Sequence, residues 1–144
     1  MSEHSIIKFK SLNYLTWAVA LAAMIISLIF SEILKYPPCT LCWYQRVFMY
    51  PLVFIVPIGI LLEDPRIYFY SLILGFIGLI IATYHTLIYH GIIQEAFKLC
   101  NAELSCKTKQ FELFNLISIP VMSLVTFLII VILNLIGVFY EKRT

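Results

Sequence analysis

The sequence predicts an all-α fold: an integral membrane four-helix bundle with both termini on the same side of the bilayer. The first observation is composition, because 62% of the 144 residues are hydrophobic, 12% are charged and the mean hydropathy is +0.96. Soluble domains are roughly half apolar and a quarter charged, so one small core could not bury this much apolar surface. The second is spacing: the apolar residues form four segments, each near or above the ~20 residues that cross a hydrocarbon core. We therefore expect a single membrane domain over residues 1–144, surrounded by lipid.

The first predicted span covers about residues 12–34. Tyr14 and Trp17 lie near its start, where aromatic residues of the membrane interface are expected. The preceding tail carries Lys8 and Lys10 and is similar to the start of a signal peptide. The apolar segment is too long for a signal peptide and lacks a small-residue cleavage site, so we expect an uncleaved anchor.

The second predicted span covers about residues 41–62 and follows a short link at about 35–40. So short a link requires the first two spans to be antiparallel neighbours. Pro51 and Pro57 lie inside the second span, and each removes a backbone hydrogen bond and favours a kink. Membrane helices tolerate such prolines when neighbouring groups bond the freed carbonyls. We therefore expect a bent helix, and a bend of this kind can open a pocket near the helix end.

The third predicted span covers about residues 67–92 and the fourth about 116–140. Gly75 and Gly78 in the third span are expected to allow a close approach of a neighbouring helix. Between these spans lies the one long connection, at about 93–115.

An even number of spans places both cysteine pairs on one face of the membrane. The tails and the second link lie on one side, and the links at about 35–40 and 93–115 lie on the other. Cys39 and Cys42 border the first of these links, and Cys100 and Cys106 lie in the second. This inference depends only on the number of spans, because it holds for either orientation in the bilayer.

The positive charges do not decide which face is cytoplasmic. The five Lys and Arg residues on the side of the tails equal the five on the side of the cysteines, namely Lys8, Lys10, Arg66, Lys142 and Arg143 against Lys35, Arg46, Lys98, Lys107 and Lys109. Disulfides persist on the oxidising face of a membrane. We therefore expect extracytoplasmic cysteine loops and cytoplasmic termini in a bacterial cell membrane. The net charge of +2 is too small to indicate a nucleic acid partner.

The two cysteine pairs indicate redox chemistry. Cys39 and Cys42 form a C-x-x-C motif that can close or open a disulfide. A helix N-terminus favours a thiolate, and we expect Cys42, with Arg46 one turn further on, to gain from this. Cys100 and Cys106 lie on the long loop. Thiol–disulfide exchange could pass electrons between the pairs. The loop pair would then react with a partner, and the C-x-x-C pair would pass electrons to an acceptor in the membrane.

Arg46 and His85 are the other candidate site residues. An Arg near the hydrocarbon costs roughly 2.5–3.5 kcal/mol on insertion scales, so it generally has a partner or reaches headgroups. Arg46 shares a helix face with Cys42, and a quinone carbonyl, which gains negative charge on reduction, would suit it. His85 lies near the cysteine end of the third span and could donate a proton to a reduced acceptor. The alternatives are an Arg bonded to headgroups and a His bonded to a neighbouring backbone.

Three other interpretations of the cysteines remain open at this point. Two structural disulfides are possible, although a C-x-x-C motif suits a purely structural bridge poorly. A zinc site is disfavoured because five residues separate Cys100 from Cys106. A haem would need a second histidine opposite His85, and outside the third span the chain has only His4, in the tail. We therefore expect no metal.

The chain resembles the DsbB/BdbC family of membrane disulfide-forming oxidoreductases, most closely its compact BdbC-type branch. One string carries the resemblance, with a C-x-x-C motif followed by aromatic residues and an Arg: Pro38-Cys39-Thr40-Leu41-Cys42-Trp43-Tyr44-Gln45-Arg46. The four spans, His85 near the end of the third span and the second cysteine pair in the last loop extend it over the whole chain.

This resemblance implies a function and a catalytic role for each cysteine. The protein would re-oxidise an extracytoplasmic thioredoxin-fold thiol oxidase of the DsbA/BdbD type, and so support disulfide bond formation in exported proteins. Cys100 would be attacked by the partner, Cys106 would then resolve the mixed disulfide or pair with Cys39, and Cys42 would be the thiolate against the quinone. Electrons would leave through the membrane quinone pool, as menaquinone or ubiquinone.

The resemblance also implies that Arg46 binds the quinone and that His85 lies beside it. Two departures affect the order of exchange: Cys100 and Cys106 are closer in sequence than in larger members, and Gln45 stands where other members can carry an acid. The competing functions are a non-catalytic membrane subunit with two structural disulfides and a vitamin-K-epoxide-reductase-like oxidase. The latter carries its active pair on a late helix, whereas here the C-x-x-C motif comes early.

Overall fold

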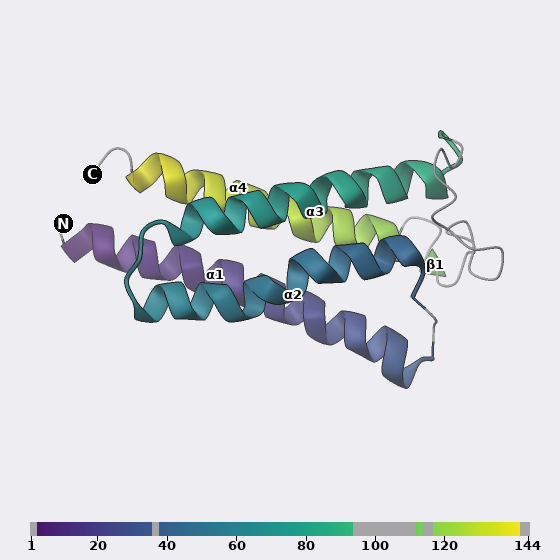
Figure 1. Ribbon diagram of the computed structural model, residues 1–144, viewed down its shortest axis with the longest axis horizontal. Helices are drawn as coiled ribbons and strands as arrows, with labels where there is room; N and C mark the ends of the chain where they lie inside the picture. The colour runs from purple at the N-terminus through teal and green to yellow at the C-terminus, as the bar shows by residue number, and fades with distance from the viewer. Residues whose placement is uncertain (1–2, 36–37, 94–111, 114–116, 142–144) are drawn as a thin grey trace.

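Four long helices dominate the part of the chain that the structure describes. The computed structural model describes residues 3–35, 38–93, 112–113 and 117–141. Within these ranges the helices run antiparallel along the bundle (Figure 1): α1 (Glu3–Leu28), which continues into a π-helical turn η1 (Ile29–Ile33), α2 (Thr40–Leu61), α3 (Ile67–Tyr89) and α4 (Ile119–Glu141). Each holds a segment long and apolar enough to cross a membrane: Lys10–Ile33, Thr40–Leu61, Ile67–Tyr89 and Ile119–Tyr140. The predicted all-α membrane bundle is therefore confirmed.

A short strand pair precedes α4 (Ile119–Glu141) and was not predicted. Strands β1 (Glu112–Leu113) and β2 (Ile117–Ser118) pair antiparallel. As a result α4 begins at Ile119 rather than at about residue 116. Pro120 explains this start, because proline is tolerated in the first turn of a helix but not further inside it.

The two ends of the bundle carry different parts of the chain. The start of α1 and the end of α4 lie at one end, on the left of Figure 1. The start of α2, the end of α3 and the start of α4 lie at the other end. This is the arrangement that four spans predict, and it puts the C-x-x-C motif at the end opposite the two terminal helix ends. Cys100 and Cys106 lie outside the described residues.

The third and fourth helices pack closely through the predicted glycines. A Cβ atom on Gly78 would overlap the ring of Phe127, and one on Gly75 would lie 3.1 Å from Cγ2 of Ile130. Phe127 and Ile130 are both fully buried. The predicted close approach at Gly75 and Gly78 is confirmed, and it forms the centre of the core.

Proline shapes the second helix as expected. Pro57 has no N–H to offer the carbonyl of Val53, four residues earlier. The indole Nε1–H of Trp17 in α1 donates to that carbonyl instead, at 3.0 Å. The helix α2 changes direction near its middle (Figure 1). The freed carbonyl is therefore bonded from a neighbouring helix, and this bond ties α1 to α2.

Candidate redox site

Cys39 caps the N-terminus of α2. Its backbone is extended, with φ −68° and ψ 165°, and its Sγ accepts a hydrogen bond from the backbone N–H of Cys42 at 3.4 Å. The sulfur occupies the place where Ser or Asp oxygen usually caps a helix. The C-x-x-C spacing produces this contact, because the helix starts at Thr40 and Cys42 is its third residue.

The two sulfur atoms of the motif lie in contact. Both cysteines are free thiols, and their Sγ atoms are 2.8 Å apart. Cys39 is buried and Cys42 is half-buried. A disulfide needs an S–S distance of about 2.05 Å, so a small movement closes the bond. The turn therefore presents a dithiol that is ready for oxidation.

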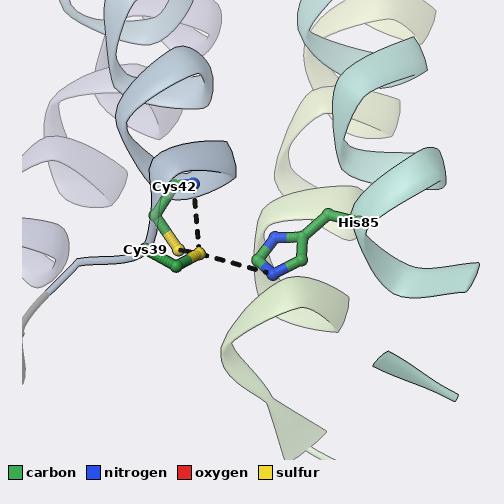
Figure 2. Close-up of side chains that lie close together, drawn as sticks. All are labelled: Cys39, Cys42 and His85. Atoms are coloured by element: carbon green, nitrogen blue, oxygen red, sulfur yellow. Dashed lines mark hydrogen bonds between the residues drawn. The ribbon is translucent and has the colours of Figure 1, made fainter. Parts of the chain in front are cut away.

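His85 reaches the pair from the third helix. Its Nε2 lies 3.6 Å from Sγ of Cys39, and Figure 2 shows the imidazole pointing across from α3 to the start of α2. Only 2% of His85 is exposed. The structure thus brings together Cys39, Cys42 and His85, three of the residues that the sequence singles out.

Gln45 completes this buried group and was missed as a site residue. Its Nε2 lies 3.1 Å from Nδ1 of His85, and 6% of the residue is exposed. The sequence holds one signal for it, since Gln45 follows Cys42 by three residues and so shares its helix face. A buried amide in a membrane helix requires a partner, and here the partner is the histidine.

The surroundings of Cys39 favour its thiolate. The hydrogen bond with the Cys42 thiol lowers the pKa of Cys39 most, burial opposes this, and His85 and the Cys42 N–H lower it further, to about 4 from an ordinary 9.0. These contacts therefore favour a thiolate on Cys39. This differs from the expectation that Cys42 gains from the helix end, because the backbone N–H of Cys42 points to the capping sulfur of Cys39.

The same three residues are placed as potential metal ligands, but the distances do not suit an ion. Cys39, Cys42 and His85 each offer one ligand atom, all within 4.8 Å of one another. Two thiolates on a tetrahedral zinc ion lie about 3.8 Å apart, since each Zn–S bond is about 2.3 Å. The observed 2.8 Å is a direct contact between the sulfurs. This geometry fits disulfide chemistry better than coordination.

Arg46 is held by the first helix. Its Nε donates to Oγ of Ser27 at 2.9 Å, and its Nη2 donates to the Ser27 carbonyl at 3.0 Å. The guanidinium also lies over the ring of Trp43, 5.6 Å from the centroid. Ser27 precedes the π-helical turn η1 (Ile29–Ile33), and such turns are common at functional sites. No local pattern in the sequence indicates Ser27, because the contact depends on how two helices cross.

A cavity of about 130 Å³ lies between α1, α2 and α4. Cys42 and Arg46 both line it, but neither Cys39 nor His85 is among its described lining residues. The other lining residues are mostly apolar: Ala23, Ile26, Ser27, Phe30, Pro38, Gln45, Met49, Tyr50, Ile119, Met122, Ser123, Thr126 and Phe127. The pair is thus divided, with Cys42 toward the cavity and Cys39 toward the histidine. The place of His85 beside a bound quinone, which the resemblance implied, therefore stays a prediction.

Comparisons with known proteins agree with this chemistry. Residues 9–137 match the family model described as "Disulfide bond formation protein DsbB". The chain is 47% identical over 119 residues to "Probable disulfide formation protein C 2" of Bacillus cereus, covering 83% of this chain and 85% of the relative. It is 41% identical over 119 residues to "Disulfide bond formation protein C" of Bacillus subtilis, covering 83% and 86%. No solved structure gives a significant match.

Proposed function

Because this chain belongs to the DsbB family of disulfide bond formation proteins, we propose that it is a quinone-dependent disulfide-generating oxidoreductase of a bacterial cell membrane. It re-oxidises an extracytoplasmic thioredoxin-fold thiol oxidase of the DsbA/BdbD type, and it so supports disulfide bond formation in exported proteins. In this proposal the cysteine loops are extracytoplasmic and the termini are cytoplasmic.

The transfer from the partner proceeds by thiol–disulfide exchange. A partner thiolate attacks Cys100, which releases Cys106, and Cys106 then attacks Cys39 and releases Cys42. The second partner thiol displaces Cys100, so the partner leaves as a disulfide. Cys100 finally attacks Cys106 and Cys39 leaves as a thiolate. Two electrons have then moved from the partner to the C-x-x-C pair, and the loop disulfide is restored.

The residues around the cavity fit a quinone ring. A bound quinone supplies the acceptor for two electrons and two protons. A cavity of roughly 150 Å³ can hold one aromatic ring, and the cavity here is of similar size, about 130 Å³, and mostly apolar. Arg46 can donate hydrogen bonds to a carbonyl oxygen there, and its contact with Ser27 keeps the guanidinium in position. Cys42 reaches the same space.

One observation carries the proposal more than any other. Within a single turn of α2, the two thiols of Cys39 and Cys42 touch each other but face different surroundings. Cys42 lines a cavity that also contains an arginine, and Cys39 contacts a buried histidine. A purely structural bridge has no need of a cavity, an arginine or a buried imidazole beside it.

The experiment is an anaerobic assay of the purified protein with a reduced DsbA-type oxidase and a soluble quinone. We expect one quinone reduced for each partner disulfide formed, followed by quinone absorbance and by thiol titration. Cys42→Ser should reduce the rate to that without enzyme, because the electron path then ends at Cys39. Continued quinone reduction in Cys39→Ser and Cys42→Ser would contradict the proposal and favour the alternative of structural disulfides.

A further inference from the structure

A chain of buried polar contacts leads away from Cys39 to a residue with no assigned role. Sγ of Cys39 lies 3.6 Å from Nε2 of His85, and Nδ1 of His85 lies 3.1 Å from Nε2 of Gln45. The exposed fractions of the three residues are 8%, 2% and 6%. Gln45 thus contacts Nδ1 of the imidazole, and Nε2 of the same ring faces the Cys39 sulfur.

The amide of Gln45 decides which nitrogen of His85 carries the proton. A neutral imidazole has one donor nitrogen and one acceptor nitrogen. The NH2 group of Gln45 can only donate, so Nδ1 of His85 accepts and Nε2 carries the hydrogen. Nε2–H then points at Sγ of Cys39, which also receives the backbone N–H of Cys42 at 3.4 Å and contacts its thiol at 2.8 Å. A backbone N–H, an imidazole N–H and the neighbouring thiol thus converge on one sulfur.

We propose that Gln45 is a positioning residue that holds His85 in its Nε2–H tautomer, so that the reduced C-x-x-C pair carries its negative charge on Cys39. This inference rests on the proposed function. When the disulfide receives two electrons and one proton, Sγ of Cys42 takes the proton and Sγ of Cys39 remains a thiolate. Cys39 can also form a disulfide with a second cysteine. When a thiolate attacks the sulfur of that second cysteine, Cys39 is the leaving group. A more stable thiolate leaves faster.

A glutamine performs this task differently from an acid. A carboxylate can only accept, so it would bind Nδ1–H and leave Nε2 with a lone pair unless the ring became cationic. An amide donates while both it and the imidazole stay neutral, which avoids burying a charged pair inside the helix bundle. Gln45 therefore provides the required tautomer at low electrostatic cost.

The first test observes the tautomer directly, without any activity assay. Nitrogen NMR of the reduced protein, with isotopically labelled histidine, distinguishes a protonated from an unprotonated ring nitrogen. The His85 signals are identified by their loss in His85→Asn. We expect protonated Nε2 and unprotonated Nδ1 in the native sequence, and a mixture of tautomers in Gln45→Met. Protonated Nδ1 in the native sequence would overturn the proposal.

The second test follows the reactivity of Cys39 with pH. Iodoacetamide modification of Cys39, measured by mass spectrometry, reports the thiolate. A lowered pKa keeps Cys39 reactive as pH falls, until pH nears that value. In Gln45→Met the reactivity of Cys39 should begin to fall about one pH unit higher. This shift corresponds to a roughly tenfold lower thiolate fraction at acidic pH. An unchanged or lower midpoint would refute the role of Gln45.

Thr86→Val is the matched control for this substitution. The Thr86 hydroxyl donates to the Ala82 carbonyl at 2.8 Å and lies 3.4 Å from the Pro120 carbonyl oxygen. This variant removes a half-buried polar contact next to His85 without touching the cysteines, and it should leave the midpoint unchanged. An equal shift in Thr86→Val would indicate general loosening and contradict the proposal. Because neither test uses a quinone or a partner, a failure of this inference can be distinguished from a failure of the proposed function.

Discussion

Cys39 and Cys42 have the same side chain and lie one helical turn apart, yet their surroundings assign them different tasks. Cys39 caps the helix and contacts His85, so its thiolate is stabilised. Cys42 lines the cavity that also contains Arg46. The Arg46 side chain is itself held by Ser27 rather than left to reach the headgroups. At the scale of residues, each reactive group of the candidate site has a fixed neighbour.

Removing the Arg46 guanidinium should weaken the reaction with quinone and leave the reaction with the partner unchanged. Arg46→Ala is expected to raise the apparent KM for quinone at least about tenfold, since hydrogen bonds to charged groups contribute about 1.5–3 kcal/mol. Ser27→Ala should raise the KM less, because Arg46 keeps its bond to the Ser27 carbonyl. The KM comes from quinone titration, and trapping of the partner's mixed disulfide on non-reducing gels should not change.

Ser31→Ala is the control for Ser27→Ala. Its hydroxyl bonds the Leu28 carbonyl on the same helix and is exposed, so its loss should not alter the KM for quinone. A KM for Arg46→Ala equal to that of the native sequence would remove Arg46 from the quinone site.

The second helix combines the redox turn with two prolines. Pro57 frees the Val53 carbonyl, and Trp17 bonds it from the first helix. Pro51 and Pro57 lie in the same helix as Cys42 and Arg46, so the bend in α2 affects the element that carries the site. At the scale of elements, the contact between Trp17 and Val53 fixes how α1 and α2 cross, and their crossing brings Ser27 to Arg46.

Trp17→Phe should destabilise the bundle by about 1–3 kcal/mol, because the Val53 carbonyl would remain buried without a donor. Denaturation of the protein in mixed micelles, followed by circular dichroism, measures this loss. Trp43→Phe is the matched control, since Trp43 is the other tryptophan and is 56% exposed. An equal effect of both substitutions would show that the indole bond contributes nothing of its own.

The whole molecule separates its redox end from its terminal end. The start of α2, the end of α3 and the start of α4 meet at one end of the bundle, and the start of α1 and the end of α4 meet at the other (Figure 1). An even span count requires this separation. A link between α3 and α4 that carries a second cysteine pair must therefore leave from the same end as the C-x-x-C motif.

Labelling of single-cysteine variants in intact cells tests this arrangement. A maleimide that cannot cross the membrane should label a variant that retains only Cys100, because its loop is extracytoplasmic in the proposed orientation. A variant whose only cysteine is Thr144→Cys should react only after the membrane is permeabilised. Labelling of both variants from the same side would contradict the four-span topology, and labelling of Thr144→Cys alone would reverse the orientation.

Much of this protein follows from local sequence patterns. Apolar segments of membrane-spanning length determine the four helices, and the C-x-x-C spacing at a helix start determines that Cys42 offers its N–H to Cys39. The sequence also identifies Arg46 and His85, because charged and titratable residues in apolar spans require a partner. Gly75 and Gly78 are recognisable in the same way as sites of close packing.

Only the tertiary structure decides which partners these residues find. Two of these contacts join different helices: His85 pairs with Gln45, and Ser27 holds Arg46. The two cysteines lie in one turn but face different neighbours, because only Cys42 lines the cavity. Such contacts depend on the rotation and register of whole helices, which the local pattern leaves free. The sequence by itself determined the spans, the redox motif and the end of the bundle at which the motif lies. Helix packing determined which sulfur contacts the histidine and which one reaches the cavity.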